Sequence, residues 1–200
     1  MKALLPLVLC VAGCSPLYRS TVEVRFEHDE QLQAHSGTWE RVELPDAPSP
    51  THAWMQSASS AADVFNLALR EEAKPAEADV HLALRAVAGE IDQGGGLVWR
   101  ARDAKNYYLA RWNPLEHNLR AYKVVDGVRT QLASAEVQAG PGWHTLRVWF
   151  MRDKFEVWFD KQSLLEGKDP TFYGPGMIGL WTKADARTQF DDLIVWEFRG

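Results

Sequence analysis

The sequence predicts an all-β protein in which two sheets pack face to face as a jelly-roll sandwich. Short segments that alternate apolar and polar residues recur at spacings of roughly 8–15 residues, which is typical of strands. Gly, Pro, Asn and Asp separate these segments, and helical periodicity is almost absent. A chain of 200 residues suffices for about one domain with a core between two layers.

Residues 1–13 are predicted to be a signal peptide. Lys2 is positively charged, and the apolar run Ala3–Val11 is too short to cross a bilayer as a helix. Val11-Ala12-Gly13-Cys14 resembles the bacterial lipoprotein signal, which implies cleavage before Cys14 and acylation of its sulfur. The alternative is an ordinary secretory signal with a chance cysteine.

Acylation of Cys14 predicts a bilayer partner and a place in the bacterial cell envelope, because each buried CH₂ group contributes about 0.8 kcal/mol to membrane binding. Ser15 resembles an outer-membrane address in the lipoprotein pattern. Residues 14–20 are predicted as a tether and residues 21–200 as the jelly-roll domain. The net charge of −5, with no basic cluster, argues against nucleic acid as a partner.

The central stretch Gly94–Lys123 predicts a three-stranded antiparallel meander, formed by Leu97–Arg102, Tyr107–Trp112 and Leu119–Val125. Leu44–Ser59 and Lys161–Pro175 are predicted as loops. Ala61–Leu69 fits a helix or a strand, and its alternation favours a strand. The other expected strands are Thr21–Glu27, Gly37–Val42, Asp79–Val87, Arg129–Val137, Trp143–Phe150, Phe155–Asp160, Met177–Lys183 and Thr188–Phe198. The first and last strands are expected to lie side by side.

A series of motifs carries a family resemblance: Gly95–Asp103, Asn106–Tyr108, Arg111, Asn113–Glu116, Asn118, Tyr122–Gly127, Gly142–Arg147, Gly179–Asp185 and Phe190–Leu193. Together they resemble a bacterial domain of unknown function that is grouped with 3-keto-disaccharide hydrolases and with laminin-G/concanavalin A-like jelly rolls. The resemblance covers roughly Asp79–Phe198 and implies a concanavalin-like sandwich with a carbohydrate-related role.

The chain departs from the catalytic relatives of this architecture at Glu90-Ile91-Asp92. Retaining β-glucanases carry a further Glu on that strand, whereas Gln93 and Gly94 follow here. Retaining hydrolysis needs two carboxyl groups about 5–5.5 Å apart, and this segment does not supply the pair alone. Asp92 and Glu116 remain the candidates for a catalytic acid or base.

The hairpin Trp143–Asp160 predicts a ligand-binding face. Leu146, Val148 and Phe150 should oppose Phe155, Val157 and Phe159 on its core side. The other side then carries Arg147, Trp149, Glu156 and Trp158, and aromatic plates beside charged groups suit the faces and hydroxyls of sugars. The alternative is a cross-strand packing pair, or a pair covered by the Pro45–Ser59 loop.

Other strands could add Arg100, Arg111, Trp181 and Lys183 to that face, although the two arginines could equally form a solvated rim. Asn113, Glu116 and Asn118 form a polar loop that could bind sugar hydroxyls or simply make a turn. Asp191 and Asp192 are candidate ligands for a structural Ca²⁺, with Glu27 and Asp29 facing them, or they bond a turn.

Nine tryptophans exceed what one two-layered fold is expected to bury. The sequence therefore predicts a membrane-anchored lipoprotein whose jelly roll binds carbohydrate and requires no cofactor. One alternative is a hydrolase or lyase acting on (3-keto-)glycosides. Another is a structural envelope lipoprotein that binds a protein partner.

Overall fold

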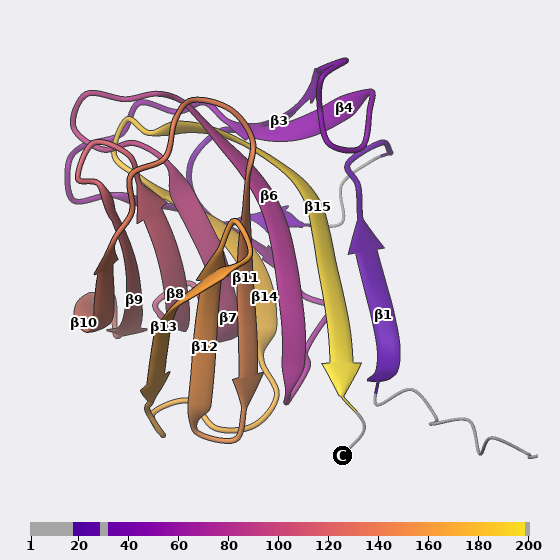
Figure 1. Cartoon of the computed structure of the whole chain (residues 1–200), viewed down its shortest axis with the longest axis vertical. Coiled ribbons are helices and arrows are strands. Elements are labelled where there is room, and N and C mark those ends of the chain that lie inside the picture. The colour runs from indigo at the N-terminus through magenta and orange to yellow at the C-terminus, as the bar shows by residue number, and fades with distance from the viewer. Residues whose placement is uncertain (1–17, 29–31, 199–200) are drawn as a thin grey trace, which may run out of the picture.

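The computed structural model describes residues 18–28 and 32–198, and within them the chain forms a two-sheet β-sandwich (Figure 1). Every strand pair in both sheets is antiparallel. The predicted fold class, an all-β jelly-roll sandwich, is confirmed. Among these residues no helix is long and apolar enough to span a membrane.

Sheet A contains eight strands. In spatial order they are β13 (Gln162–Lys168), β12 (Lys154–Phe159), β11 (His144–Met151), β6 (Ala78–Ala88), β15 (Arg187–Phe198), β4 (His52–Gln56) and β3 (Trp39–Glu43), and β1 (Tyr18–Val24) also pairs with β15. Figure 1 shows β1 beside β15 at one edge, so the first and last strands are neighbours as expected. β1 begins at Tyr18, inside the segment predicted as a tether.

Sheet B contains seven strands. In spatial order they are β10 (Val128–Glu136), β9 (Asn118–Val125), β8 (Asn106–Asn113), β7 (Gly95–Asp103), β14 (Met177–Lys183), β5 (Phe65–Arg70) and β2 (Gln33–Ala34). The expected meander is confirmed as β7–β8–β9. The expected strand within Ala61–Leu69 is confirmed as β5, although it starts only at Phe65.

Two segments predicted as loops contain strands. β4 lies within Leu44–Ser59, and Ala53–Gln56 are all buried, so the segment has no alternation to reveal it. β13 lies within Lys161–Pro175, and it is an edge strand that pairs only with β12. Period-two alternation marks a strand with one buried face, and neither segment has that pattern clearly.

The core lies between the sheets and is rich in aromatic residues. Trp99 of β7 stacks on Tyr108 of β8 with ring centroids 5.3 Å apart. From sheet A, Phe150 and Phe155 approach Trp99 with centroids at 6.5 and 5.8 Å. The predicted core side of the β11–β12 hairpin is confirmed, since Leu146, Val148 and Phe150 pair with Phe159, Val157 and Phe155 and all are buried.

We expect Trp99→Ala to lower the free energy of unfolding by about 3–5 kcal/mol, because it opens a cavity where the two sheets meet. Urea denaturation followed by circular dichroism would measure this loss. The control is Val128→Ala at a side chain that is 68% exposed, which should change stability by less than about 0.5 kcal/mol. Equal losses for both variants would contradict this account of the core.

Candidate functional site

The sheet topology separates the candidate residues into two groups on opposite faces of the sandwich. Arg147, Trp149, Glu156 and Trp158 lie on the outer face of sheet A. Arg111, Trp181 and Lys183 lie on strands of sheet B. The expectation that these strands adjoin the β11–β12 hairpin is therefore wrong, because the two groups belong to different sheets.

The outer face of sheet A carries charged side chains in cross-strand register. Arg147 lies opposite Trp158 on β12 and opposite His81 on β6. Its guanidinium donates to both Asp79 oxygens at 2.7 and 2.6 Å and stacks over the Trp158 ring at 4.2 Å. Burial alone would raise the pKa of Asp79, but hydrogen bonds from His81 and Arg147 lower it. The carboxylate is therefore charged at neutral pH.

Three half-buried indoles lie on the same face, those of Trp149, Trp158 and Trp196. Trp149 and Trp196 flank Asp79 in one row across the sheet. His81 packs edge-on against Trp196 with ring centroids 4.6 Å apart. We call this surface the tryptophan platform and define it by Asp79, His81, Arg147, Trp149, Glu156, Trp158 and Trp196.

A pocket of about 220 Å³ adjoins the platform. His81, Thr145 and Ile194 line it from the platform's own strands, and Trp143 lines it as well. The Nε1 atom of Trp143 is buried without a hydrogen-bond partner among the described residues. Aromatic surface and the Thr145 hydroxyl therefore occur together beside the platform.

The second group forms a cluster on the outer face of sheet B, where the loops after β6, β8 and β14 meet. We call it the Asp92–Arg111 cluster and define it by Asp92, Arg111, Asn113, Glu116, Asn118, Arg120 and Lys183. Arg111 Nη2 donates to Asp92 at 3.1 and 3.2 Å and to Glu116 at 3.2 Å. Asn113 Nδ2 also donates to Asp92, and Lys183 Nζ lies 3.6 Å from that carboxylate.

Hydrogen bonds from backbone N–H groups to side-chain oxygens fix the loops that carry Asp92 and Glu116. The Asp185 carboxylate accepts the N–H groups of Glu90, Ile91 and Asp92, which holds the Asp92 loop. Gly89 opens that loop with a φ of +145°, and a Cβ there would lie 1.9 Å from the Asp92 carbonyl oxygen. Asn113 Oδ1 accepts the N–H of Glu116, as expected for a turn residue. The same side chain donates to Asp92, so Asn113 both stabilises the turn and belongs to the cluster.

The charges in the cluster are paired in a way that does not suit glycoside hydrolysis. Partial burial would raise the pKa of Glu116, but hydrogen bonds from Asn118 and Arg111 and the charges of Arg111 and Arg120 lower it to about 2. A general acid needs a carboxyl group that holds its proton near the working pH. Arg111 Nη2 also contacts both carboxylates, so a guanidinium lies between the two candidate catalytic groups.

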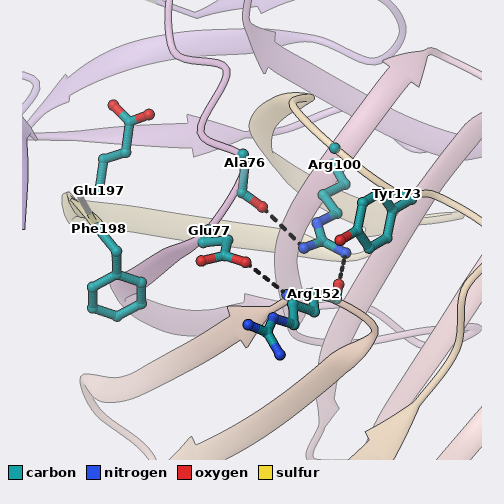
Figure 2. A pocket seen from close by; sticks show the side chains of 8 residues that line it. Ala76, Glu77, Arg100, Arg152, Tyr173, Glu197 and Phe198 are labelled. Carbon is teal, nitrogen blue, oxygen red and sulfur yellow. Dashed lines mark hydrogen bonds between the residues drawn. The ribbon is translucent and has the colours of Figure 1, made fainter. Parts of the chain in front are cut away.

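Trp181 and Arg100 are not surface groups. Trp181 is 0% exposed and donates from Nε1 to the Tyr107 hydroxyl at 3.2 Å. Arg100 is 3% exposed and donates to the carbonyls of Ala76, Phe172 and Arg152. Figure 2 shows Arg100 beside Tyr173 in a pocket. Its volume is about 280 Å³. Both side chains therefore hold the fold together rather than line an open face.

Asp191 and Asp192 hold the Ser49 loop. Asp191 Oδ2 accepts the Ser49 N–H at 2.8 Å, and Asp192 Oδ1 accepts the Ser49 hydroxyl at 2.6 Å. Burial raises the pKa of Asp191 to about 7, with further contributions from Asp192 and Glu27. Within residues 18–28 and 32–198 no three acidic, His or Cys side chains are grouped to hold a metal. The calcium site stays a prediction, since Asp29 lies outside the described residues. Cys14, the predicted acylation site, also lies outside them.

Three of the platform residues, Asp79, His81 and Trp196, were not predicted from the sequence. A signal was present, because Asp79 and His81 alternate with the core residues Val80 and Leu82. What was missing was the order of strands in sheet A, which places β6 and β15 beside the β11–β12 hairpin.

Comparison with known proteins supports the fold. No family model matches the chain, and no curated protein matches it. The carbohydrate-binding module CBM66 from Bacillus subtilis aligns with a TM-score of 0.68 at 18% identity, over 82% of this chain and 93% of that one. A GH43 protein, BlXynB mutant K247S from Bacillus licheniformis, gives 0.60 at 15% identity, over 88% of this chain and 39% of that one.

A β-glucanase from Bacillus licheniformis gives a TM-score of 0.55 at 9% identity, over 90% of this chain and 98% of that one. At these identities the similarity shows a shared jelly-roll fold. This class of protein includes both binding modules and glycoside hydrolases, so the choice between them rests on the sites of this chain.

We predict that Glu116→Gln lowers the free energy of unfolding at neutral pH and that its difference from the wild type shrinks as the pH falls from 4.5 towards 2. The reason is that the carboxylate has a lower pKa in the folded state, about 2, than its usual 4.5. Urea unfolding at several pH values would measure the difference. The matched control is Glu90→Gln in a neighbouring loop, and the same pH dependence in that variant would contradict the prediction.

Proposed function

We propose that this protein binds carbohydrate on the tryptophan platform and acts as a binding module rather than as an enzyme. The observation that carries the proposal is the set of three half-buried indoles, Trp149, Trp158 and Trp196, interleaved with ionised groups on one sheet face. Trp is a costly residue to leave in contact with water, and its exposure on a face without a covering layer favours a ligand.

The chemistry of the platform suits a saccharide. Sugar rings offer apolar C–H faces, which pack on indoles, and hydroxyls, which need both donors and acceptors. Here Arg147 is a donor and Glu156 an acceptor, while the buried Asp79 holds the Arg147 guanidinium in place. The Arg147–Asp79 pair also fixes the guanidinium over Trp158, so the surface is arranged before a ligand arrives. The fold, shared with a carbohydrate-binding module, is consistent with this role.

The alternative of a hydrolase or lyase acting on (3-keto-)glycosides depends on Asp92 and Glu116. The low pKa of Glu116 and the guanidinium between the two carboxylates do not favour it. The alternative of a structural lipoprotein would instead use the platform to contact a protein.

We expect Trp149→Ala and Trp158→Ala each to weaken binding about tenfold, since a stacked ring contributes on the order of 1 kcal/mol beyond its buried area. Calorimetric titration of the full chain with β-glucan and xylan oligosaccharides would measure the affinities. The control is Tyr173→Ala, at an aromatic residue 65% exposed on another surface, which should bind normally. Stable co-purification of a protein with no glycan binding would favour the structural alternative.

We further propose that Cys14 anchors the protein in the cell envelope, at the outer membrane. Cys14→Ser should abolish labelling by an alkyne fatty acid and should move the protein from the detergent phase to the aqueous phase, because acyl chains supply the membrane affinity. Cys10→Ser, within the predicted signal peptide, is the matched control and should leave labelling intact. Unchanged labelling of Cys14→Ser would exclude the anchor.

A further inference from the structure

The Asp92–Arg111 cluster contains two buried polar atoms that lack a partner. Arg111 is 1% exposed and Asn118 is 5% exposed. Among the described residues, Arg111 Nε and Asn118 Oδ1 make no hydrogen bond. Buried polar groups are normally paired, so two such atoms in one cluster indicate a partner that the protein itself does not supply.

The chemistry of the two atoms restricts that partner. Arg111 Nη2 and Asn118 Nδ2 bind the two oxygens of the same Glu116 carboxylate at 3.2 and 3.0 Å, so their side chains flank one group. Of the two free atoms, Arg111 Nε is a donor and Asn118 Oδ1 is an acceptor. A hydroxyl group accepts from a guanidinium and donates to an amide oxygen, whereas a metal cation or a simple anion satisfies only one of them.

The rim of the cluster offers contacts for neighbouring hydroxyls. Lys183 Nζ lies 3.6 Å from Asp92 Oδ2, too far for a hydrogen bond, and its side chain is 22% exposed. The Glu116 side chain is 43% exposed. Solvent therefore reaches an ammonium donor and a carboxylate acceptor at the rim of the cluster. In the sheet register Gly96 lies between Arg111 and Trp181, so Trp181 is the indole nearest to the cluster along this row.

We infer that the Asp92–Arg111 cluster is a second saccharide-binding site, which takes one sugar ring through adjacent hydroxyl groups. The inference rests on the proposed function for its class of ligand, but it concerns the opposite face of the sandwich. A platform on sheet A and a hydroxyl-binding site on sheet B would allow one chain to hold two glycan strands together.

The indole N–H signals of the nine tryptophans report on both faces in one ¹⁵N NMR titration. The probes are the methyl glycosides of glucose, galactose and mannose, up to about 50 mM, because single-sugar binding is commonly in the millimolar range. At least one glycoside should shift the Trp181 signal. Lys183→Ala should weaken that binding about tenfold, as expected for the loss of a charged hydrogen bond.

The matched control is Lys105→Ala, at an exposed residue in the turn between β7 and β8, which should bind as the wild type does. Absence of a Trp181 shift with all three glycosides would overturn the inference and leave water as the partner of the two atoms. An unchanged affinity in Lys183→Ala would overturn it as well. Signals from Trp149, Trp158 and Trp196 report the platform independently, so failure of the proposed function is distinguished from failure of the second site.

Discussion

The structure depends on one geometric constraint: a strand has two sides, and a two-layered sandwich buries only one of them between its sheets. Trp54, Trp99 and Trp112 occupy the shared core. Other indoles must lie elsewhere, and those of Trp149, Trp158 and Trp196 lie half-buried on the outer face of sheet A. The tryptophan platform is a consequence of this constraint, because these three indoles lie on the side of their strands that faces away from the core.

The two outer faces meet this constraint differently. Sheet B covers its outer face with its own side chains, which form a second apolar cluster around Leu69, Val98 and Trp181. Arg129 lies over it, 4.4 Å from the Tyr122 ring, 5.5 Å from Phe65 and 5.7 Å from Trp181. Tyr122 and Phe65 come from strands four positions apart in the sheet, so these side chains converge over the face. The apolar part of this face is thereby covered, whereas Lys183 and Glu116 at its polar end are partly exposed.

On both outer faces a carboxylate is paired with a guanidinium, Asp79 with Arg147 and Glu116 with Arg111, and this pairing suits ligand binding better than acid catalysis. Asp79 and Glu116 each have a pKa lowered by hydrogen bonds to cationic or polar neighbours, so both are held as anions. Ionised acceptors fixed beside guanidinium donors can bind hydroxyls without reorganisation. Proton transfer to a leaving group would need the opposite arrangement, a carboxyl group kept neutral by its surroundings. Asp191, whose pKa burial raises to about 7, is such a group, but its oxygens are bonded to the backbone N–H groups of Ser49 and Asp192.

Alternation along the chain was sufficient to predict the sandwich, the meander, the β11–β12 hairpin and the side on which Trp149 and Trp158 lie, because strand formation and side-chain direction depend on neighbours within a few residues. Alternation could not predict that β7, β8 and β14 belong to a different sheet from β11, since strand order is set by contacts between residues far apart in the sequence. The assignment of Trp181 to an open face failed for the same reason: its outward direction was local information, whereas its burial depends on Phe65 and Arg129, which distant strands bring over it.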